Sequence, residues 1–138
     1  MDAVNHPPRY TSHPSGIECI DVTERLDFCA GNAVKYLWRA DDKGRRGEDI
    51  KKAIWYLERY INNFAINAHY QMGRDDTMLA RYAERLLQHG GWNSAPICNI
   101  IMAAVNGYGP GIQTAIHQCH MIINHPTEKY DGPRAQLS

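Results

Sequence analysis

The strongest constraint on the fold is an apolar stripe of helical period in the segment 47–67. Its members are Ile50, Ala53, Ile54, Leu57, Tyr60, Ile61 and Phe64. Intervals of three and four residues place these side chains on one face of an α-helix and leave the other face polar. The spacing therefore predicts one long amphipathic helix that buries a single side.

Shorter segments on both sides of this helix show related patterns. The segment 28–40, FCAGNAVKYLWRA, carries a second stripe, and the charged turn DDKGRRG joins the two segments as a helical hairpin. Further helices are expected at about 17–26, 75–91, 94–107 and 111–124. No segment alternates as a strand does between hairpin turns. The predicted class is all-α, a compact bundle of about six helices.

Two boundary signals stand out in the second half. Ser94 is placed to act as the N-cap of the fifth helix. The Gly109-Pro110-Gly111 run predicts a break before the sixth helix. The glycine-rich stretch 106–111, NGYGPG, is a weak candidate for an anion-binding loop, because such stretches are more often plain connectors between helices.

Length and composition place the chain in a broad class. A chain of 138 residues is one domain's worth, so 1–138 is expected to be a single domain. Fifteen basic residues balance fifteen acidic ones, which argues against binding to long nucleic acid. Four scattered cysteines favour reduced thiols. With no signal-like start and no stretch of membrane-spanning length, a soluble cytoplasmic protein without a membrane partner is expected.

The last two predicted helices are apolar on several sides. Their apolar residues are Ile97, Ile100, Ile101, Met102, Ala103, Ala104, Val105, Ile112, Ala115, Ile116, Met121, Ile122 and Ile123. A helix that is apolar all round must be buried on all sides, which a small domain can hardly arrange alone. Assembly as a homo-oligomer is therefore expected.

Cations and aromatic residues alternate on the polar faces of the two central helices. The residues are Asn32, Lys35, Tyr36 and Arg39 on the first and Lys52, Trp55, Tyr56 and Arg59 on the second. Cations that bond phosphate, beside rings that stack on a base, suit a nucleotide. Spacing alone favours a solvated helix face whose aromatic rings lie on a neighbouring element. The repetition of the pattern on two consecutive helices makes a nucleotide-binding face nearly as well supported.

Metal-binding candidates are weaker. Glu18 and Asp21 have a spacing that could hold Mg²⁺, although solvent-facing helix charge is the simpler interpretation. His117 and His120 share a face near Cys119 and His125, but the helical period turns Cys119 elsewhere. A polar interface or a ligand contact suits these two histidines better, and their role stays open.

Familiar catalytic motifs are missing. The sequence has no Walker A motif, dinucleotide fingerprint, nucleophile elbow or HExxH. No resident metal or cofactor is therefore expected.

Three ordered blocks resemble a small bacteriophage protein family of formerly unknown function, over about residues 5–62. They are NHPPRYTSHPSGIECIDV, GNAVKYLWRADDKG and EDIKKAIWYLERYI. The family is similar to the C-terminal domain of a coliphage nucleotide kinase, which implies nucleotide handling during infection. The matching residues are His6, Tyr10, Glu18, Asp21, Asn32, Lys35, Tyr36, Arg39, Lys52 and Tyr56. The resemblance divides the domain into a nucleotide-handling core at 5–66 and a helical extension at 67–138 for oligomerisation and pocket building.

The stretch NHPPRYTS matches the first of these blocks. Two adjacent prolines hold a segment extended. We expect an N-terminal strap that lays His6, Arg9 and Tyr10 across the face of Lys35 and Arg39, with Tyr10 near the base or sugar.

Three functions remain in competition. The first is sequestration of a small nucleotide, such as a cyclic or ADP-ribose-derived signal of host defence, in the cytoplasm of the infected bacterium. The second is an enzyme, a nucleoside monophosphate kinase acting on deoxynucleotides, with Mg²⁺ held by Glu18 or Asp21. The third is an interaction protein that blocks a host factor through its apolar helices.

Overall fold

In a computed structural model, which describes residues 13–40, 46–66 and 72–124, every regular element is a helix. The helices are α2 (Cys19–Thr23), α3 (Phe28–Arg39), α4 (Arg46–Ile66), α6 (Thr77–His89), α7 (Ser94–Asn106) and α8 (Gly109–Asn124). The all-α class and the six helices expected from the sequence are confirmed over these ranges. The expected strap at residues 5–12 lies outside them.

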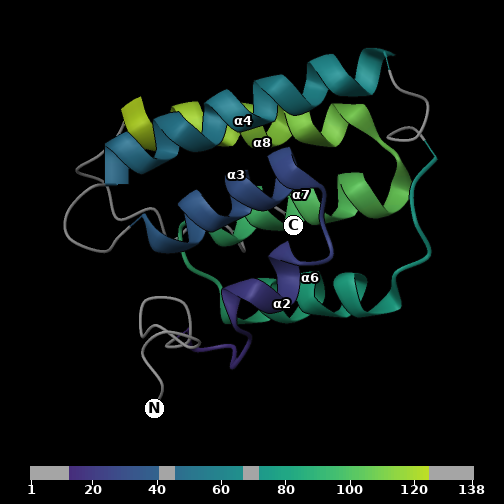
Figure 1. The fold of residues 1–138 in the computed structure, drawn as a ribbon. Helices are drawn as coiled ribbons and strands as arrows, with labels where there is room; N and C mark the ends of the chain where they lie inside the picture. The colour runs from purple at the N-terminus through teal and green to yellow at the C-terminus, as the bar shows by residue number, and fades with distance from the viewer. Residues whose placement is uncertain (1–12, 41–45, 67–71, 125–138) are drawn as a thin grey trace.

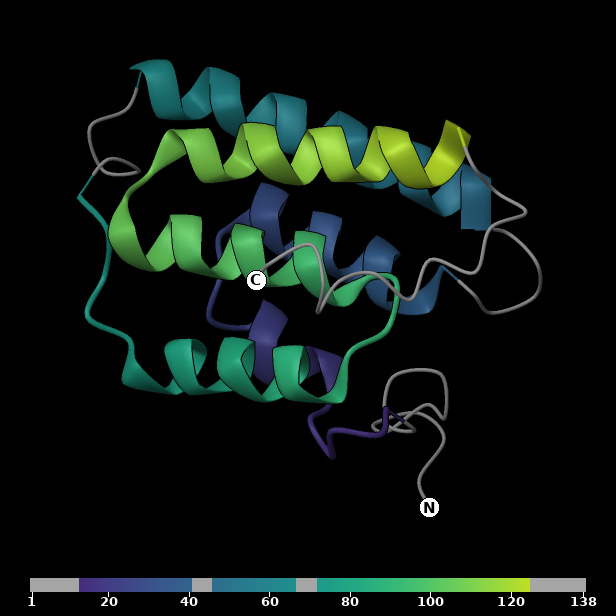
Figure 2. The ribbon, with the colours of Figure 1, turned by 180° about the vertical axis from the view of Figure 1, so that it is seen from behind.

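The helices form three layers (Figure 1). Helices α4 and α8 make one outer layer, α3 and α7 the middle layer, and α6 with the short α2 the other outer layer; the reverse view agrees (Figure 2). Contacts join α3 to α7 and α4 to α8, so elements from the two halves of the sequence pack on one another. A single apolar core includes side chains from all six helices.

The apolar stripe of α4 faces this core as predicted. Ile50, Ala53, Ile54, Leu57 and Tyr60 are buried. Ile61 is partly buried, and the side chain of Phe64 lies outside the described part. On α3 the corresponding stripe of Ala30, Ala33, Val34 and Leu37 is completely buried. The period of hydrophobic residues thus determines which sides of α3 and α4 remain for solvent or a ligand.

Carboxylates cap the helices that flank the core. Asp27 is the N-cap of α3 and accepts a bond from the Ala30 N–H at 3.0 Å. Asp76 caps α6 through the Leu79 N–H at 3.1 Å and also pairs with Arg25 at 3.2 Å. These contacts satisfy backbone donors that a helix leaves free in its first turn.

Two boundary predictions were wrong. Ser94 is the first residue of α7 rather than its N-cap, which is Asn93. The buried Ser94 hydroxyl instead donates to the Gly90 carbonyl. The run from Gly109 to Gly111 is not a break but the first turn of α8. Pro110 is tolerated there because the first-turn N–H groups have no partner within the helix.

The premise behind the expected homo-oligomer also fails. Helix α7 lies against α3, α6 and α8, so its apolar sides are covered within one chain. The residues buried on α7 include Ile97, Ile100, Ile101, Ala103 and Ala104, and those on α8 include Ile112, Ala115, Cys119 and Ile122. Only Met102 and Met121 among the large apolar residues of these two helices are classed as exposed. Self-association stays a prediction without this support.

Two further expectations concern thiols and membranes. All four cysteines are free and buried. No helix in the described ranges combines the length and apolar character that a membrane crossing requires.

Candidate functional site

Stacked tyrosines join α3 to α4 at the centre of the candidate face. The rings of Tyr36 and Tyr56 are 5.9 Å apart between centroids, with planes 16° apart. Three cations surround Tyr36: Lys35 Nζ lies 5.0 Å from its ring centroid, Lys52 Nζ 5.4 Å and Arg39 Cζ 5.8 Å. The structure thus brings five of the predicted site residues, from two helices, onto one ring pair.

Negative charge compensates only part of this cluster. Arg39 Nε lies 3.8 Å from Asp49 Oδ2, and Asp49 is only 2% exposed. The other carboxylate oxygen, Oδ1, is buried and has no hydrogen-bond partner among the described residues. Within the described ranges neither Lys35 nor Lys52 pairs with a carboxylate. Cations in excess over carboxylates favour an anion at this position.

Two exposed rings flank the tyrosine pair. Phe28 is 74% exposed and meets Tyr56 edge-on at 6.1 Å, and Trp55 is 58% exposed and meets Tyr56 edge-on at 5.0 Å. Tyr36 and Tyr56 are partly buried, and each turns one ring face to the other. The accessible aromatic surface of the site therefore belongs mainly to Phe28 and Trp55.

Two predicted residues lie at the margin of the cluster. The Asn32 amide donates to the Phe28 carbonyl at 2.8 Å, which leaves its second N–H and its Oδ1 for a ligand. Arg59 is exposed, and its charge opposes the burial and the Asp27 charge that raise the pKa of the Cys29 thiol. Among the contacts of the described residues, none joins Arg59 to the Tyr36 ring.

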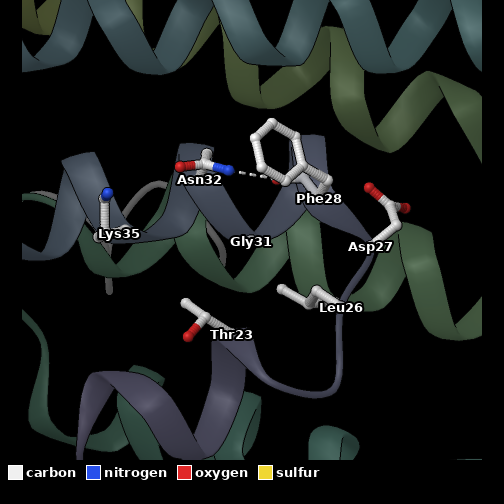
Figure 3. A pocket seen from close by; sticks show the side chains of 7 residues that line it. All are labelled: Thr23, Leu26, Asp27, Phe28, Gly31, Asn32 and Lys35. Atoms are coloured by element: carbon white, nitrogen blue, oxygen red, sulfur yellow. Dashed lines mark hydrogen bonds between the residues drawn. The ribbon is translucent and has the colours of Figure 1, made fainter.

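A hollow of about 220 Å³ opens between α2 and α3 (Figure 3). It is lined by Thr23, Leu26, Asp27, Phe28, Gly31, Asn32 and Lys35. Two of these, Asn32 and Lys35, were predicted site residues, and Lys35 also lies beside the Tyr36 ring. The hollow and the cation cluster are therefore adjacent.

Gly31 determines the shape of this hollow. A Cβ at this position would lie 3.2 Å from the Thr23 carbonyl oxygen. Helix α3 can approach the end of α2 this closely because Gly31 has no side chain. Sequence reasoning missed Thr23, Leu26, Asp27, Phe28 and Gly31 as lining residues. A glycine at the start of a helical stripe was the only signal, and it is ambiguous without the α2–α3 turn.

Glu18 and Asp21, the weak metal candidates, act at the start of α2. They form a reciprocal capping box, in which Asp21 Oδ2 accepts a bond from the Glu18 N–H at 3.0 Å. The capping box gives both carboxylates a structural role at the start of α2. Over the ranges that the structure describes, no group of three or more His, Cys, Asp or Glu side chains could hold a metal ion.

The described residues of the second half, 72–124, show no comparable cluster. His117 and His120 are exposed on α8, whereas Cys119 is buried, as the helical period predicted. The stretch 106–111 ends α7 with Gly107 in the left-handed conformation (φ 66°) and a bond from the Tyr108 N–H to the Ala103 carbonyl. That stretch is thus a helix-ending turn that leads into α8.

The predicted residues His6, Arg9 and Tyr10 lie outside the described ranges. Their expected place across the Lys35 and Arg39 face stays a prediction.

Comparison with known proteins gives a match to a family model over part of the chain and no activity. Neither the curated proteins nor the solved structures contain a match to the chain. The matched family segment includes α2, α3 and α4 as far as Glu58, and hence the Tyr36–Tyr56 pair and the hollow. Arg59 and helices α6 to α8 lie beyond it. Residues 4–58 match the family DUF3310, described as a protein of unknown function.

Proposed function

We propose that this protein binds a small nucleotide on the exposed side of α3 and α4. The observation that carries the proposal is the convergence of Lys35, Arg39 and Lys52 on the Tyr36 ring, at 5.0, 5.8 and 5.4 Å. Like charges gathered around one ring repel one another, and phosphate oxygens relieve that repulsion through charge-assisted hydrogen bonds. The exposed rings of Phe28 and Trp55 beside the cations provide surface for a base.

Sequestration is preferred to phosphoryl transfer. A kinase needs carboxylates that are free to bind Mg²⁺ beside the phosphates. The two residues expected to do this, Glu18 and Asp21, make a capping box at the start of α2. A binding protein needs only the cations and rings that the α3–α4 face presents. The kinase and the host-factor-blocking protein have no further support from the described contacts.

The biological ligand follows from the resemblance to phage proteins at residues 5–62. A phage protein that binds nucleotides without altering them would help the infection by removing a signal of host defence. We therefore propose cyclic and ADP-ribose-derived nucleotides as the ligands and the host cytoplasm as the place of action. A second copy of the chain could enclose such a ligand, in line with the expected homo-oligomer.

A release experiment separates binding from turnover. The protein is incubated with cyclic dinucleotides, ADP-ribose derivatives and nucleoside monophosphates in separate samples, filtered to remove free ligand, and heated. Chromatography of the released fraction should recover the intact nucleotide in stoichiometric amount. Recovery of a chemically altered nucleotide would contradict sequestration, and transfer of phosphate from ATP to dGMP or dTMP would support the kinase.

A further inference from the structure

The proposed binding of phosphate by the cations makes no use of the hollow between α2 and α3. The hollow nevertheless opens next to these cations. Lys35 belongs to both, because it lines the hollow and lies 5.0 Å from the Tyr36 ring. Phe28 also belongs to both, since it lines the hollow and contacts Tyr56 edge-on at 6.1 Å. A ligand whose phosphate is held by Lys35 therefore has its next chemical group at the rim of the hollow.

The tyrosine pair is a poor stacking surface for a base. Tyr36 stacks on Tyr56 and has three cations near its ring, so a base would have to displace one of these partners. Phe28 is 74% exposed and contacts its neighbour only edge-on, so its ring remains accessible. Of the two accessible rings, Trp55 does not line the hollow and Phe28 does.

The lining of the hollow suits a flat, partly polar ring. Leu26 and Phe28 provide apolar contacts beside Gly31, which is buried where α3 approaches Thr23 (Figure 3). The Thr23 hydroxyl and the Asn32 amide groups, beyond the bond from Asn32 to the Phe28 carbonyl, can bond to ring nitrogens and carbonyl oxygens. A hollow of about 220 Å³ is smaller than the roughly 300–1,000 Å³ of sites that enclose whole ligands. It therefore suits one part of a nucleotide.

We infer that the base of a nucleoside 5′-phosphate enters this hollow and stacks on Phe28, while its phosphate lies on Lys35, Arg39 and Lys52. The inference rests on the proposed nucleotide binding and adds a separate base site to it. Phe28, Thr23 and Asn32 then determine which bases bind, and the cations provide affinity that does not depend on the base.

The test compares ligands with and without a base. AMP, GMP, CMP and UMP are titrated by calorimetry into wild type and variants, and ribose 5-phosphate serves as the ligand without a base. In Phe28→Ala the best nucleotide should bind about tenfold or more weakly, the size expected for loss of a stacking ring. Binding of ribose 5-phosphate should change less than twofold. Lys52→Ala should weaken both classes of ligand to a similar degree.

Matched variants keep the result interpretable. Phe28 is highly exposed, so Phe28→Ala should keep the far-ultraviolet circular dichroism of the wild type. Met121→Ala removes an exposed apolar side chain on α8, behind α4 in the view of Figure 1, and should leave all affinities unchanged. Thr23→Val removes the hydroxyl at constant shape and should change the order of preference among the four bases.

The inference and the proposed function fail in different ways. If Lys52→Ala weakens nucleotide binding while Phe28→Ala and Thr23→Val do not, the base lies elsewhere and the inference is overturned, although nucleotide binding stands. A base-dependent loss in Trp55→Ala instead of Phe28→Ala overturns it in the same way. If none of the four nucleotides binds to the wild type but a cyclic or ADP-ribose-derived nucleotide is retained in the release experiment, the inference is overturned and nucleotide binding stands. If no nucleotide of any class binds, both proposals are overturned.

Discussion

The ring of Tyr36 lies 5.9 Å from the ring of Tyr56, with only 16° between their planes. This contact joins two helices at the point where Lys35, Arg39 and Lys52 gather. The aromatic pair therefore has a structural role, because it positions cations from both α3 and α4 on one face.

Truncation of Tyr56 tests this role. Tyr56 contacts Tyr36, Phe28 and Trp55, and each aromatic pair contributes about 0.5–1.5 kcal/mol beyond its buried area. Tyr56→Ala should lower the free energy of unfolding by about 2 kcal/mol and weaken nucleotide binding. Tyr56→Phe keeps the ring and should stay close to the wild type. Urea unfolding measures the stability of both variants. Equal losses of stability in Tyr56→Ala and Tyr56→Phe would show that the hydroxyl, and not the ring, stabilises the protein.

Gly31 and Gly47 provide a matched pair of helical glycines. A methyl group at Gly31 meets the Thr23 carbonyl oxygen at 3.2 Å, whereas no atom of the described residues lies within 4 Å of a Cβ at Gly47. Gly47→Ala should stabilise the protein by about 0.5–1 kcal/mol because alanine favours the helix. Gly31→Ala gains the same propensity but must displace α2, so a net loss of about 1 kcal/mol is expected. Equal stabilisation in both variants would contradict the close approach of α3 to α2.

The cysteine thiols should be unreactive in the native protein. Burial raises the pKa of Cys19, Cys98 and Cys119 to about 12 each, and it raises the pKa of Cys29 as well. The thiolate is the reactive form, so a chromogenic disulfide reagent at pH 8 should modify the native protein far more slowly than free glutathione. In denaturant all four thiols should react rapidly. One thiol that reacts at the glutathione rate without denaturant would contradict its burial.

His13 should make stability depend on pH. Burial, with a smaller effect of His89, lowers the pKa of His13 below 6.5, and its Nδ1 accepts a bond from the Ser15 N–H at 3.1 Å. The unfolded chain then takes up the proton more readily than the native protein does. The stabilisation by neutral His13 is therefore complete above pH 6.5 and is lost as the pH falls below that value.

A pair of histidine variants isolates this effect. His13→Asn keeps an acceptor that cannot be protonated, so its melting temperature should fall less between pH 7 and pH 5 than that of the wild type. His117→Asn, at an exposed position on α8, serves as the control and should follow the wild type. An equal fall in melting temperature between pH 7 and pH 5 in all three proteins would exclude His13 as the source of the pH dependence.

Sequence periodicity predicted the helices and the polar face because each depends on local spacing. Lys35 and Tyr36 on α3, and Lys52 and Tyr56 on α4, meet because the apolar stripes of both helices face one core. The burial of the apolar sides of α7 within one chain could not be predicted from local spacing. It arises because the neighbouring helices α6 and α8 and the distant helix α3 all pack against α7.

The hollow was unpredictable for a similar reason. It depends on the turn between α2 and α3 and on the approach of Gly31 to Thr23. Phe28 would be assigned to a core by its hydrophobicity. It is exposed because Asp27 caps the helix directly before it and the first turn of α3 leaves this side chain outside the core.

The most direct test of nucleotide binding on the α3–α4 face compares two adjacent lysines of α4. Lys52 lies 5.4 Å from the Tyr36 ring, whereas Lys51 is exposed and has no contact with that ring in the described structure. Calorimetric titration with the best-binding nucleotide should show a loss of about tenfold or more in Lys52→Ala, the cost of a charge-assisted bond, and a loss below twofold in Lys51→Ala. Equal losses in the two variants, or no nucleotide binding by the wild type, would contradict the account.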